Sequence, residues 1–196
     1  MLISAKLALP KTLLAHGHLT LNGSKMSKST GNVLDPEEVI TKYGRDPFVF
    51  NLLYDVSLNA DGDFSPERLG NISNSMLIGG RGNLVNRVVS LCNKYEITQG
   101  KTDGTRLQER DTEDPELTFD KRYPNIESKY LTAFAIQTYL QDRYKLVQRA
   151  NEYITKSEPR KKYKDESTKQ EAIEDLQFLL YIVKNLAILS APFLVE

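Results

Sequence analysis

Residues 168–190 read TKQEAIEDLQFLLYIVKNLAILS and give the clearest indication of the fold class. Apolar residues recur there every three or four positions, which is the spacing that places side chains on one face of an α-helix. The predicted face is a wide stripe formed by Ile173, Leu176, Leu179, Leu180, Val183, Leu186 and Ala187. A stripe of this width is typical of a helix that packs against other helices. Pro192 ends the predicted helix, because proline lacks the backbone N–H that would continue it.

Helical spacing also occurs upstream in two long segments. Residues 126–155 place one set of side chains near a common face, namely Leu131, Phe134, Thr138, Val147, Ala150 and Ile154. A proline-led cap at Ser65 opens a further helix, which we expect to reach about Tyr95 with a bend or break at Gly79 and Gly80. Three or four long helices in the later two thirds of the chain predict a helical bundle.

The first third of the chain begins with a short β element. Residues 11–24 predict a β-hairpin or strand pair, because they contain alternating apolar residues and the tight-turn pair Asn22-Gly23. Residues 59–64 are rich in turn-forming residues, and we expect them to be a connector into the Ser65 cap.

Two short helices are predicted between the β element and this connector. Asp35, followed by a proline, has the pattern of a helix N-cap, and the helix should end at Gly44. Asp46 repeats the same start signal for a second helix that reaches about Val56.

Composition restricts the possible classes of protein. The 196 residues are 40% apolar and 27% charged, which is an ordinary balance for a globular chain with a core. There are 26 cationic and 26 anionic residues, so affinity for nucleic acid must come from local clusters of charge. The single cysteine, Cys92, excludes an internal disulfide framework and a multi-cysteine zinc site. There is no apolar run of about 18 residues that would predict a membrane span.

The segment with the most chemical information is Lys25-Met26-Ser27-Lys28-Ser29-Thr30-Gly31-Asn32. Two lysines and several hydroxyls lie on a short loop, and Gly23 and Gly31 allow the loop to bend. Such a loop can bring two ammonium groups onto a polyphosphate and neutralise its negative charge. A solvated basic loop is the simpler interpretation of two lysines at this spacing, but the complete five-residue string Lys-Met-Ser-Lys-Ser is far more specific.

This string resembles the KMSKS loop of the class I aminoacyl-tRNA synthetases, and its flanks, residues 16–19 and 31–36, resemble that family too. The resemblance implies that Lys25, Met26, Ser27, Lys28 and Ser29 bind ATP. It further implies that Lys28, assisted by Lys25, stabilises the triphosphate while the carboxylate of the substrate displaces pyrophosphate. Both lysines are therefore the predicted catalytic residues.

Further segments resemble the methionyl-tRNA synthetases in particular. They are residues 43–46, 61–65, 82–87, 150–154, 157–159 and 191–194, so the resemblance covers nearly the whole chain outside residues 98–125. In general style it is closest to fungal mitochondrial members, which implies a location in the mitochondrial matrix, with the cytoplasm as the alternative. The implied partners are ATP as substrate, Mg²⁺, methionine and tRNA(Met). No zinc site is expected, and no membrane partner.

The resemblance also assigns residues for anticodon binding. Asn83 and Arg87 are four residues apart and share one helix face, where an amide and a guanidinium suit the edges and planes of unstacked bases. Capping or a surface ion pair is the simpler interpretation of these two side chains. Arg160 occupies the place of the family's base-stacking tryptophan, and either its guanidinium or Tyr163 is a candidate to replace that ring. The basic run at residues 156–164 is either a solvated turn or a contact for phosphates.

The implied fold is mostly α, with a small β-containing stem and KMSKS region followed by an α-helical anticodon-binding bundle. Residues 1–60 are expected to be the end of a catalytic domain, and residues 61–196 the anticodon-binding domain with a flexible insertion at about 98–125. Most of the Rossmann-type catalytic domain, the His-x-Gly-His motif and the methionine pocket are missing, so we expect the chain alone to be inactive. The alternatives are a non-catalytic tRNA-binding protein or a truncated gene product that retains only the anticodon-binding domain.

Overall fold

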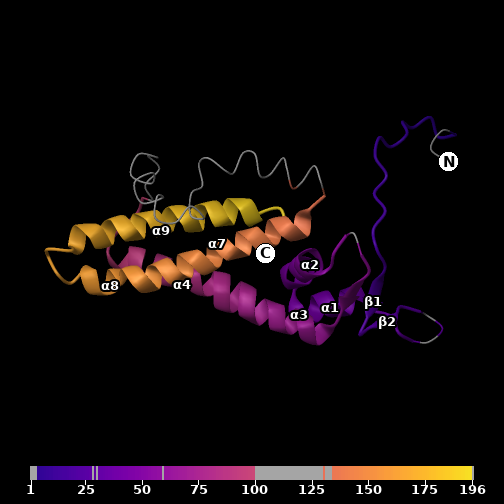
Figure 1. Ribbon diagram of the computed structural model, residues 1–196, viewed down its shortest axis with the longest axis horizontal. Helices are drawn as coiled ribbons and strands as arrows, with labels where there is room; N and C mark the ends of the chain where they lie inside the picture. Colours follow the sequence, from indigo (N-terminus) through magenta and orange to yellow (C-terminus); the bar gives the residue numbers. More distant parts are fainter. Residues whose placement is uncertain are drawn as a thin grey trace.

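The computed structural model describes residues 4–27, 29, 31–58, 60–99, 130 and 134–195. Helices dominate it, as predicted, and a small sheet lies at the end of the molecule opposite the tips of the longest helices (Figure 1). In chain order the elements are β1 (Leu19–Leu21), β2 (Ser24–Lys25), α1 (Pro36–Tyr43), α2 (Arg45–Asp55), β3 (Gly62–Phe64), α3 (Pro66–Ile72), η2 (Ser73–Gly82), α4 (Asn83–Lys94), α7 (Ile136–Ser157), α8 (Pro159–Lys162) and α9 (Lys169–Ser190). No helix in the described part of the chain is long and apolar enough to cross a membrane.

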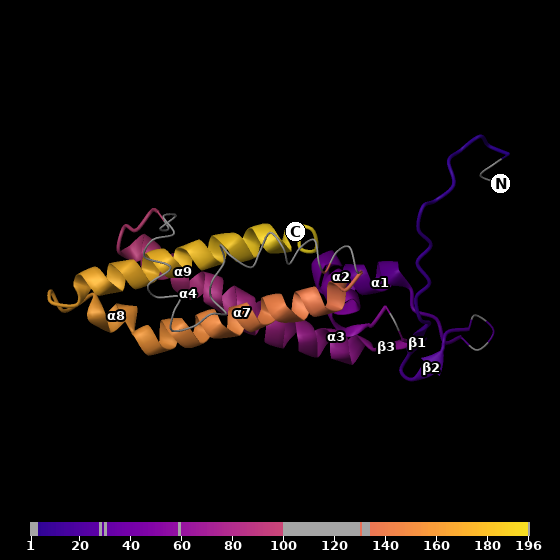
Figure 2. The same ribbon diagram turned by 45° about the horizontal axis from the view of Figure 1, so that its top comes forward.

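The helical bundle is built from α4, α7 and α9, which lie side by side in both views (Figures 1 and 2). Its largest cluster of buried residues comes from these three helices: Leu84, Val88, Cys92, Leu146, Val147, Ala150, Ile154, Leu176, Phe178, Leu179, Ile182, Leu186 and Leu189. Burying a side chain of the size of leucine contributes about 1.5–3 kcal/mol relative to leaving it exposed, so this cluster is the main source of the bundle's stability.

The buried face predicted for the last helix, α9, agrees with the structure at the centre of that face but not at its edges. Three predicted residues, Leu176, Leu179 and Leu186, are buried, but Ala187 is exposed. The helix also buries residues that the prediction missed: Ala172, Phe178, Ile182 and Leu189. It does so because α9 packs against α4 on one side and α7 on another, and two partners widen and rotate the buried arc.

The helix predicted at residues 126–155 begins later than expected. Helix α7 starts at Ile136, after Phe134, which is exposed and adopts a left-handed backbone conformation (φ 53°). The predicted core residues Val147, Ala150 and Ile154 are buried, whereas Thr138 is exposed. Leu131 lies outside the described residues, as do nearly all of the residues of the predicted insertion at 98–125.

Of the bend or break predicted at Gly79 and Gly80, the break is wrong. The chain continues from α3 through the π-helix η2 into α4, with helical backbone angles at both junctions. The pair of glycines instead permits a close contact between helices, because a Cβ on Gly80 would lie 2.8 Å from Tyr144 Oη. Asn151 of α7 donates a hydrogen bond to the Gly80 carbonyl (3.1 Å), which holds the two helices together at this point.

The small sheet has the strand order β2-β1-β3. The hairpin between β1 and β2 turns at Asn22 and Gly23, as predicted, and both residues have positive φ (52° and 75°). The prediction of a turn at residues 59–64 is wrong, because Gly62–Phe64 forms a strand parallel to β1. Residues 12–18, predicted as strand, are described but have no strand assigned.

The first short helix begins and ends as its caps predict, but the predicted start of the second at Asp46 is wrong, because α2 begins at Arg45 with Gly44 as its N-cap and Asp46 lies inside the helix. Asp35 accepts a hydrogen bond from the Glu37 backbone N–H (2.9 Å), and Gly44 ends α1 with a φ of 88°. Ser65 caps α3 in the same way, through a hydrogen bond from the Arg68 N–H (3.1 Å). Such caps satisfy backbone donors at the first turn of a helix, which has no partners for them of its own.

Candidate functional site

The loop at residues 26–34 extends from the β1–β2 hairpin and is closed at its base. The Ser27 N–H donates to the Asn32 carbonyl (2.9 Å), and the Asn32 amide donates to the carbonyls of Lys25 (3.1 Å) and Ser24 (3.3 Å). Gly31 adopts a φ of 72°, which is a conformation that favours glycine and lets the chain turn back. The base of the loop is therefore fixed by Asn32, although the sequence prediction concentrated on the lysines.

The predicted ATP-binding residues differ in their surroundings. Lys25 lies on β2 and is exposed. Met26 is half-buried and packs against the small core of the sheet and the helices α1 to α3. The hydroxyls of Ser27 and Ser29 share a hydrogen bond (2.8 Å). Lys28 lies outside the described residues.

Two carboxylates, one in β3 and one just before it, hold the hairpin that carries this loop. Asp63 accepts hydrogen bonds from the Gly23 N–H (2.6 Å) and the Thr20 hydroxyl (2.7 Å), and these bonds lower the pKa of its carboxyl group. Asp61 accepts one from the His18 N–H (2.7 Å). The Asp-Gly-Asp segment thus fixes the hairpin from a strand about forty residues away along the chain. Among the described residues, no group of three or more His, Cys, Asp or Glu side chains is arranged to hold a metal ion.

Two neighbouring clefts lie along the bundle, and both contain predicted anticodon residues. The larger, of about 710 Å³, which we call the α8 cleft, is lined by Asn86, Arg87, Ser90, Leu91, Ile154, Thr155, Glu158, Pro159, Arg160, Lys161 and Lys164. The other, of about 540 Å³, which we call the η2 cleft, is lined by Ser75, Gly79, Gly80, Asn83, Arg87, Tyr144, Val147, Gln148, Asn151, Glu152, Thr155 and Lys156. Arg87 lines both clefts, so it joins Asn83 to Arg160 in one continuous surface.

Arg87 is held against α7 by a residue that the sequence analysis missed. Its Nη2 donates a hydrogen bond to the Thr155 hydroxyl (3.1 Å), and this hydroxyl donates in turn to the Asn151 carbonyl (2.8 Å). A guanidinium has five N–H donors in a fixed plane, and one hydrogen bond orients this plane toward the clefts. The partner is 68 residues away in sequence and on another helix, and no local pattern could have indicated it.

Arg160 lies on α8, the short helix that follows α7. Glu158 ends α7 in a left-handed conformation (φ 44°), and the buried Pro159 then begins α8. Tyr163 directly follows α8, and its ring stacks on that of Tyr95 with 3.7 Å between ring centroids. One face of Tyr163 is thus already covered within the protein, which leaves Arg160 as the better candidate for contact with a base.

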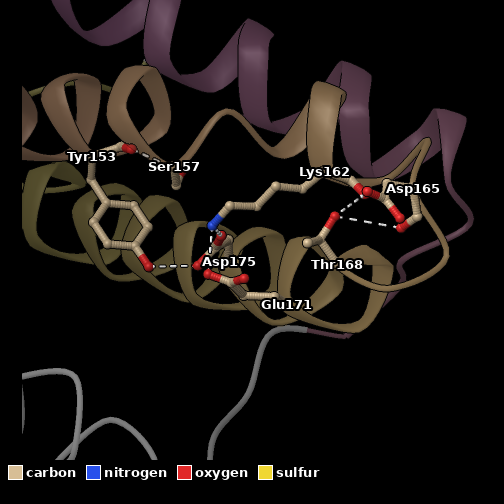
Figure 3. A network of polar contacts seen from close by, with 7 residues as sticks. All are labelled: Tyr153, Ser157, Lys162, Asp165, Thr168, Glu171 and Asp175. Carbon is tan, nitrogen blue, oxygen red and sulfur yellow. Dashed lines mark hydrogen bonds and ion pairs between the residues drawn. The ribbon is translucent and has the colours of Figure 1, made fainter.

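One cation of the basic run, Lys162, does not line the α8 cleft. Lys162 reaches α9, where its ammonium group contacts Glu171 (2.5 Å) and the buried Asp175 (3.4 Å) (Figure 3). The other carboxylate oxygen of Asp175 accepts a hydrogen bond from Tyr153 of α7 (2.7 Å). Partial burial lowers the pKa of Lys162, but the hydrogen bond that its ammonium group donates to Glu171 and the negative charge of Asp175 outweigh this effect and raise the pKa.

Comparison with known proteins gives consistent matches. Residues 1–89 match the family described as tRNA synthetases class I (M). The chain is 38% identical to the methionine–tRNA ligase of Caldanaerobacter subterraneus subsp. tengcongensis over 99% of its own length and 30% of that protein. It is 33% identical to the methionine–tRNA ligase of Synechocystis sp. over 99% of its own length and 35% of that protein.

The fold matches as well. The structure of Mycobacterium tuberculosis methionyl-tRNA synthetase in complex with methionyl-adenylate aligns with the whole chain with a TM-score of 0.80 at 27% identity, and the chain covers 38% of it. In sequence and fold the chain is therefore similar to class I tRNA synthetases. Within this class it is similar to the methionyl-tRNA synthetases. It spans about a third of the length of the relatives that it matches.

Proposed function

We propose that this chain is the part of a methionine–tRNA ligase that carries the ATP-binding KMSKS loop and the anticodon-binding bundle. The observation that carries the proposal is that Arg87 joins the predicted anticodon residues Asn83 and Arg160 in one surface of two adjoining clefts. The family match and the closed base of the loop at residues 26–34 support the ATP-binding half. The mitochondrial location and the fungal style remain predictions from the sequence.

In the proposed reaction, methionine and ATP form methionyl-adenylate with Mg²⁺ present, and methionine is then transferred to tRNA(Met). Lys25 and Lys28 neutralise the negative charge that develops on the leaving pyrophosphate, with Met26, Ser27 and Ser29 shaping the loop. The contribution of this chain is charge stabilisation and positioning, without a covalent intermediate on its residues. The bundle binds the anticodon and so selects the tRNA.

The RNA-binding half is tested with an RNA hairpin that carries the anticodon of tRNA(Met), mixed with the purified 196-residue chain. We expect binding that weakens about 5- to 150-fold in Arg87→Ala, because stacking on one base is worth about 1–3 kcal/mol. Lys184→Met is the control, since this residue is exposed on α9 and lines neither cleft. Equal affinity for a hairpin with a changed anticodon would refute the proposed recognition.

The ATP half is tested in a chimera in which this chain replaces the corresponding third of the Caldanaerobacter relative. Methionine-dependent ATP–pyrophosphate exchange should fall about 100-fold or more in Lys28→Ala, since removing one donor to developing charge costs on that order. Lys42→Ala, an exposed residue of α1, should leave the exchange unchanged. The 196-residue chain alone should show no exchange, and clear activity would contradict the expectation that half a site does not catalyse.

A further inference from the structure

The orientation of Arg160 depends on contacts made by a very short helix. Helix α8 comprises only Pro159–Lys162, and a single helical turn is not stable in water by itself because nucleation is unfavourable. It follows Glu158, whose left-handed backbone conformation is uncommon for a residue with a side chain. The place of Arg160 in the α8 cleft must therefore be imposed by neighbouring helices.

The side chain of Lys162 connects α8 to α9. Residues two apart in a helix point to nearly opposite sides, so Lys162 reaches inward to α9 while Arg160 lines the cleft. Figure 3 shows this side chain extending along the gap between the helices, with its ammonium group at Glu171 and Asp175. The backbone carbonyl of Lys162 also accepts a hydrogen bond from the Thr168 hydroxyl (2.9 Å).

The buried carboxylate of Asp175 requires a cationic partner, and Lys162 provides it. The Asp175 side chain is only 2% exposed, and its two oxygens are bound to groups from two different helices, Tyr153 of α7 and Lys162 of α8. A buried carboxylate that loses its cationic partner is strongly destabilised, so Lys162 cannot leave without cost. One carboxylate on α9 thus connects the three helices α7, α8 and α9.

A second contact fixes the other end of α8. The stacking of Tyr163 on Tyr95 joins the residue after α8 to the residue that ends α4. Helix α8 is consequently held from the α9 side by a charged contact and from the α4 side by an aromatic one. Neither contact uses Arg160, Lys161 or Lys164, which all remain in the lining of the cleft.

We propose that Lys162 and Asp175 are positioning residues for RNA recognition, which set the orientation of Arg160 without touching the RNA. The inference rests on the proposed function, because it assumes that the α8 cleft receives the anticodon. It assigns specificity to an ion pair on the side of α8 that faces away from the ligand. Arg160 is then a pre-oriented group, and less conformational freedom is lost when a base stacks on it.

The test measures affinity for the anticodon hairpin and for a hairpin with one changed anticodon base. Lys162→Met is expected to weaken binding to the correct hairpin about tenfold and to reduce discrimination between the two. Lys184→Met removes the same charge from an exposed site and should change affinity less than about twofold. Lys162→Arg keeps the positive charge and should restore affinity to within about threefold. Circular dichroism should show equal helix content in all variants.

The decisive comparison repeats Lys162→Met in an Arg160→Ala background. If Lys162 acts through Arg160, the second substitution should cause no further loss of affinity. An equal loss in both backgrounds would overturn the proposal, because Lys162 would then act through the fold or through its charge. If Arg160→Ala itself binds like the unmodified chain, the proposed role of Arg160 fails instead, and the two failures are distinguishable.

A second variant covers the case in which Lys162→Met does not fold. Asp175→Asn keeps the size of this side chain and an oxygen for the Tyr153 hydroxyl, and removes the negative charge that contacts Lys162. It also makes the protein more positive, which by itself favours RNA binding. A loss of about threefold that disappears in the Arg160→Ala background would support the proposal, and unchanged or stronger binding would refute it.

Discussion

The contact between Gly80 and Tyr144 predicts that the Tyr144 side chain decides whether Gly80→Ala destabilises or stabilises the protein. In Gly80→Ala, the new methyl group would lie 2.8 Å from Tyr144 Oη and 3.0 Å from Cε2. The ring cannot retreat freely, because it also packs edge-on against Tyr54 with 6.3 Å between centroids. Overpacking of this kind costs about 1–3 kcal/mol, while replacing a helical glycine by alanine gains about 1 kcal/mol. We expect a net destabilisation of about 1 kcal/mol.

In a Tyr144→Ala background the methyl group has room, and the same substitution should stabilise the protein by about 0.5–1 kcal/mol. The assay is urea unfolding followed by circular dichroism for the four proteins of this double-mutant cycle. Gly70→Ala is the control, because a methyl group there meets only Tyr43 at an ordinary distance of 4.0 Å, and it should stabilise the otherwise unmodified chain. The same destabilisation in both backgrounds would show that Tyr144 does not limit the approach of η2 to α7.

Three further predictions concern the core, the cysteine and the clefts. Leu176→Ala should lower the free energy of unfolding by about 2–5 kcal/mol in urea, since Leu176 is fully buried in the bundle. Burial raises the pKa of Cys92 to about 11, so a thiol reagent at pH 8 should label the folded protein far more slowly than the urea-unfolded one. The pKa of this thiol is higher in the folded protein than in the unfolded one. The contribution of the neutral buried thiol to the free energy of unfolding is therefore fully present below the thiol's ordinary pKa, and it is lost as pH rises toward about 11. For the anticodon hairpin, Lys164→Met should reduce the slope of log affinity against log salt by about 0.7 if this residue meets a phosphate.

The parts of the fold that the sequence predicted correctly are those determined by local interactions. Asp35 and Ser65 cap their helices with backbone groups two or three residues away, and Gly44 ends α1 through its own backbone angle. The Asn22-Gly23 turn is likewise determined by those two residues. Such features can be predicted because the interacting groups are adjacent in the chain.

Strand β3 was not predictable in this way. It is three residues long, pairs with β1 in parallel, and is bound through Asp61 and Asp63 to residues about forty positions earlier. Aspartate and glycine are rare in strands and common in turns, so local preference indicated the wrong structure. The clefts show the same limit, since the spacing of Asn83 and Arg87 predicted a shared surface but gave no sign of Thr155.

The basic run at residues 156–164 shows why a cluster of like charges cannot be interpreted as one unit. From the sequence, the lysines of this run could not be distinguished from one another, and the choice for the run lay between a solvated turn and a contact for phosphates. In the structure Lys162 is withdrawn by the buried carboxylate of Asp175, whereas Arg160 and Lys164 line the cleft. The chain has no net charge, so any attraction for RNA depends on where each cation points. An acidic residue inside the bundle therefore determines the arrangement of positive charge on its surface.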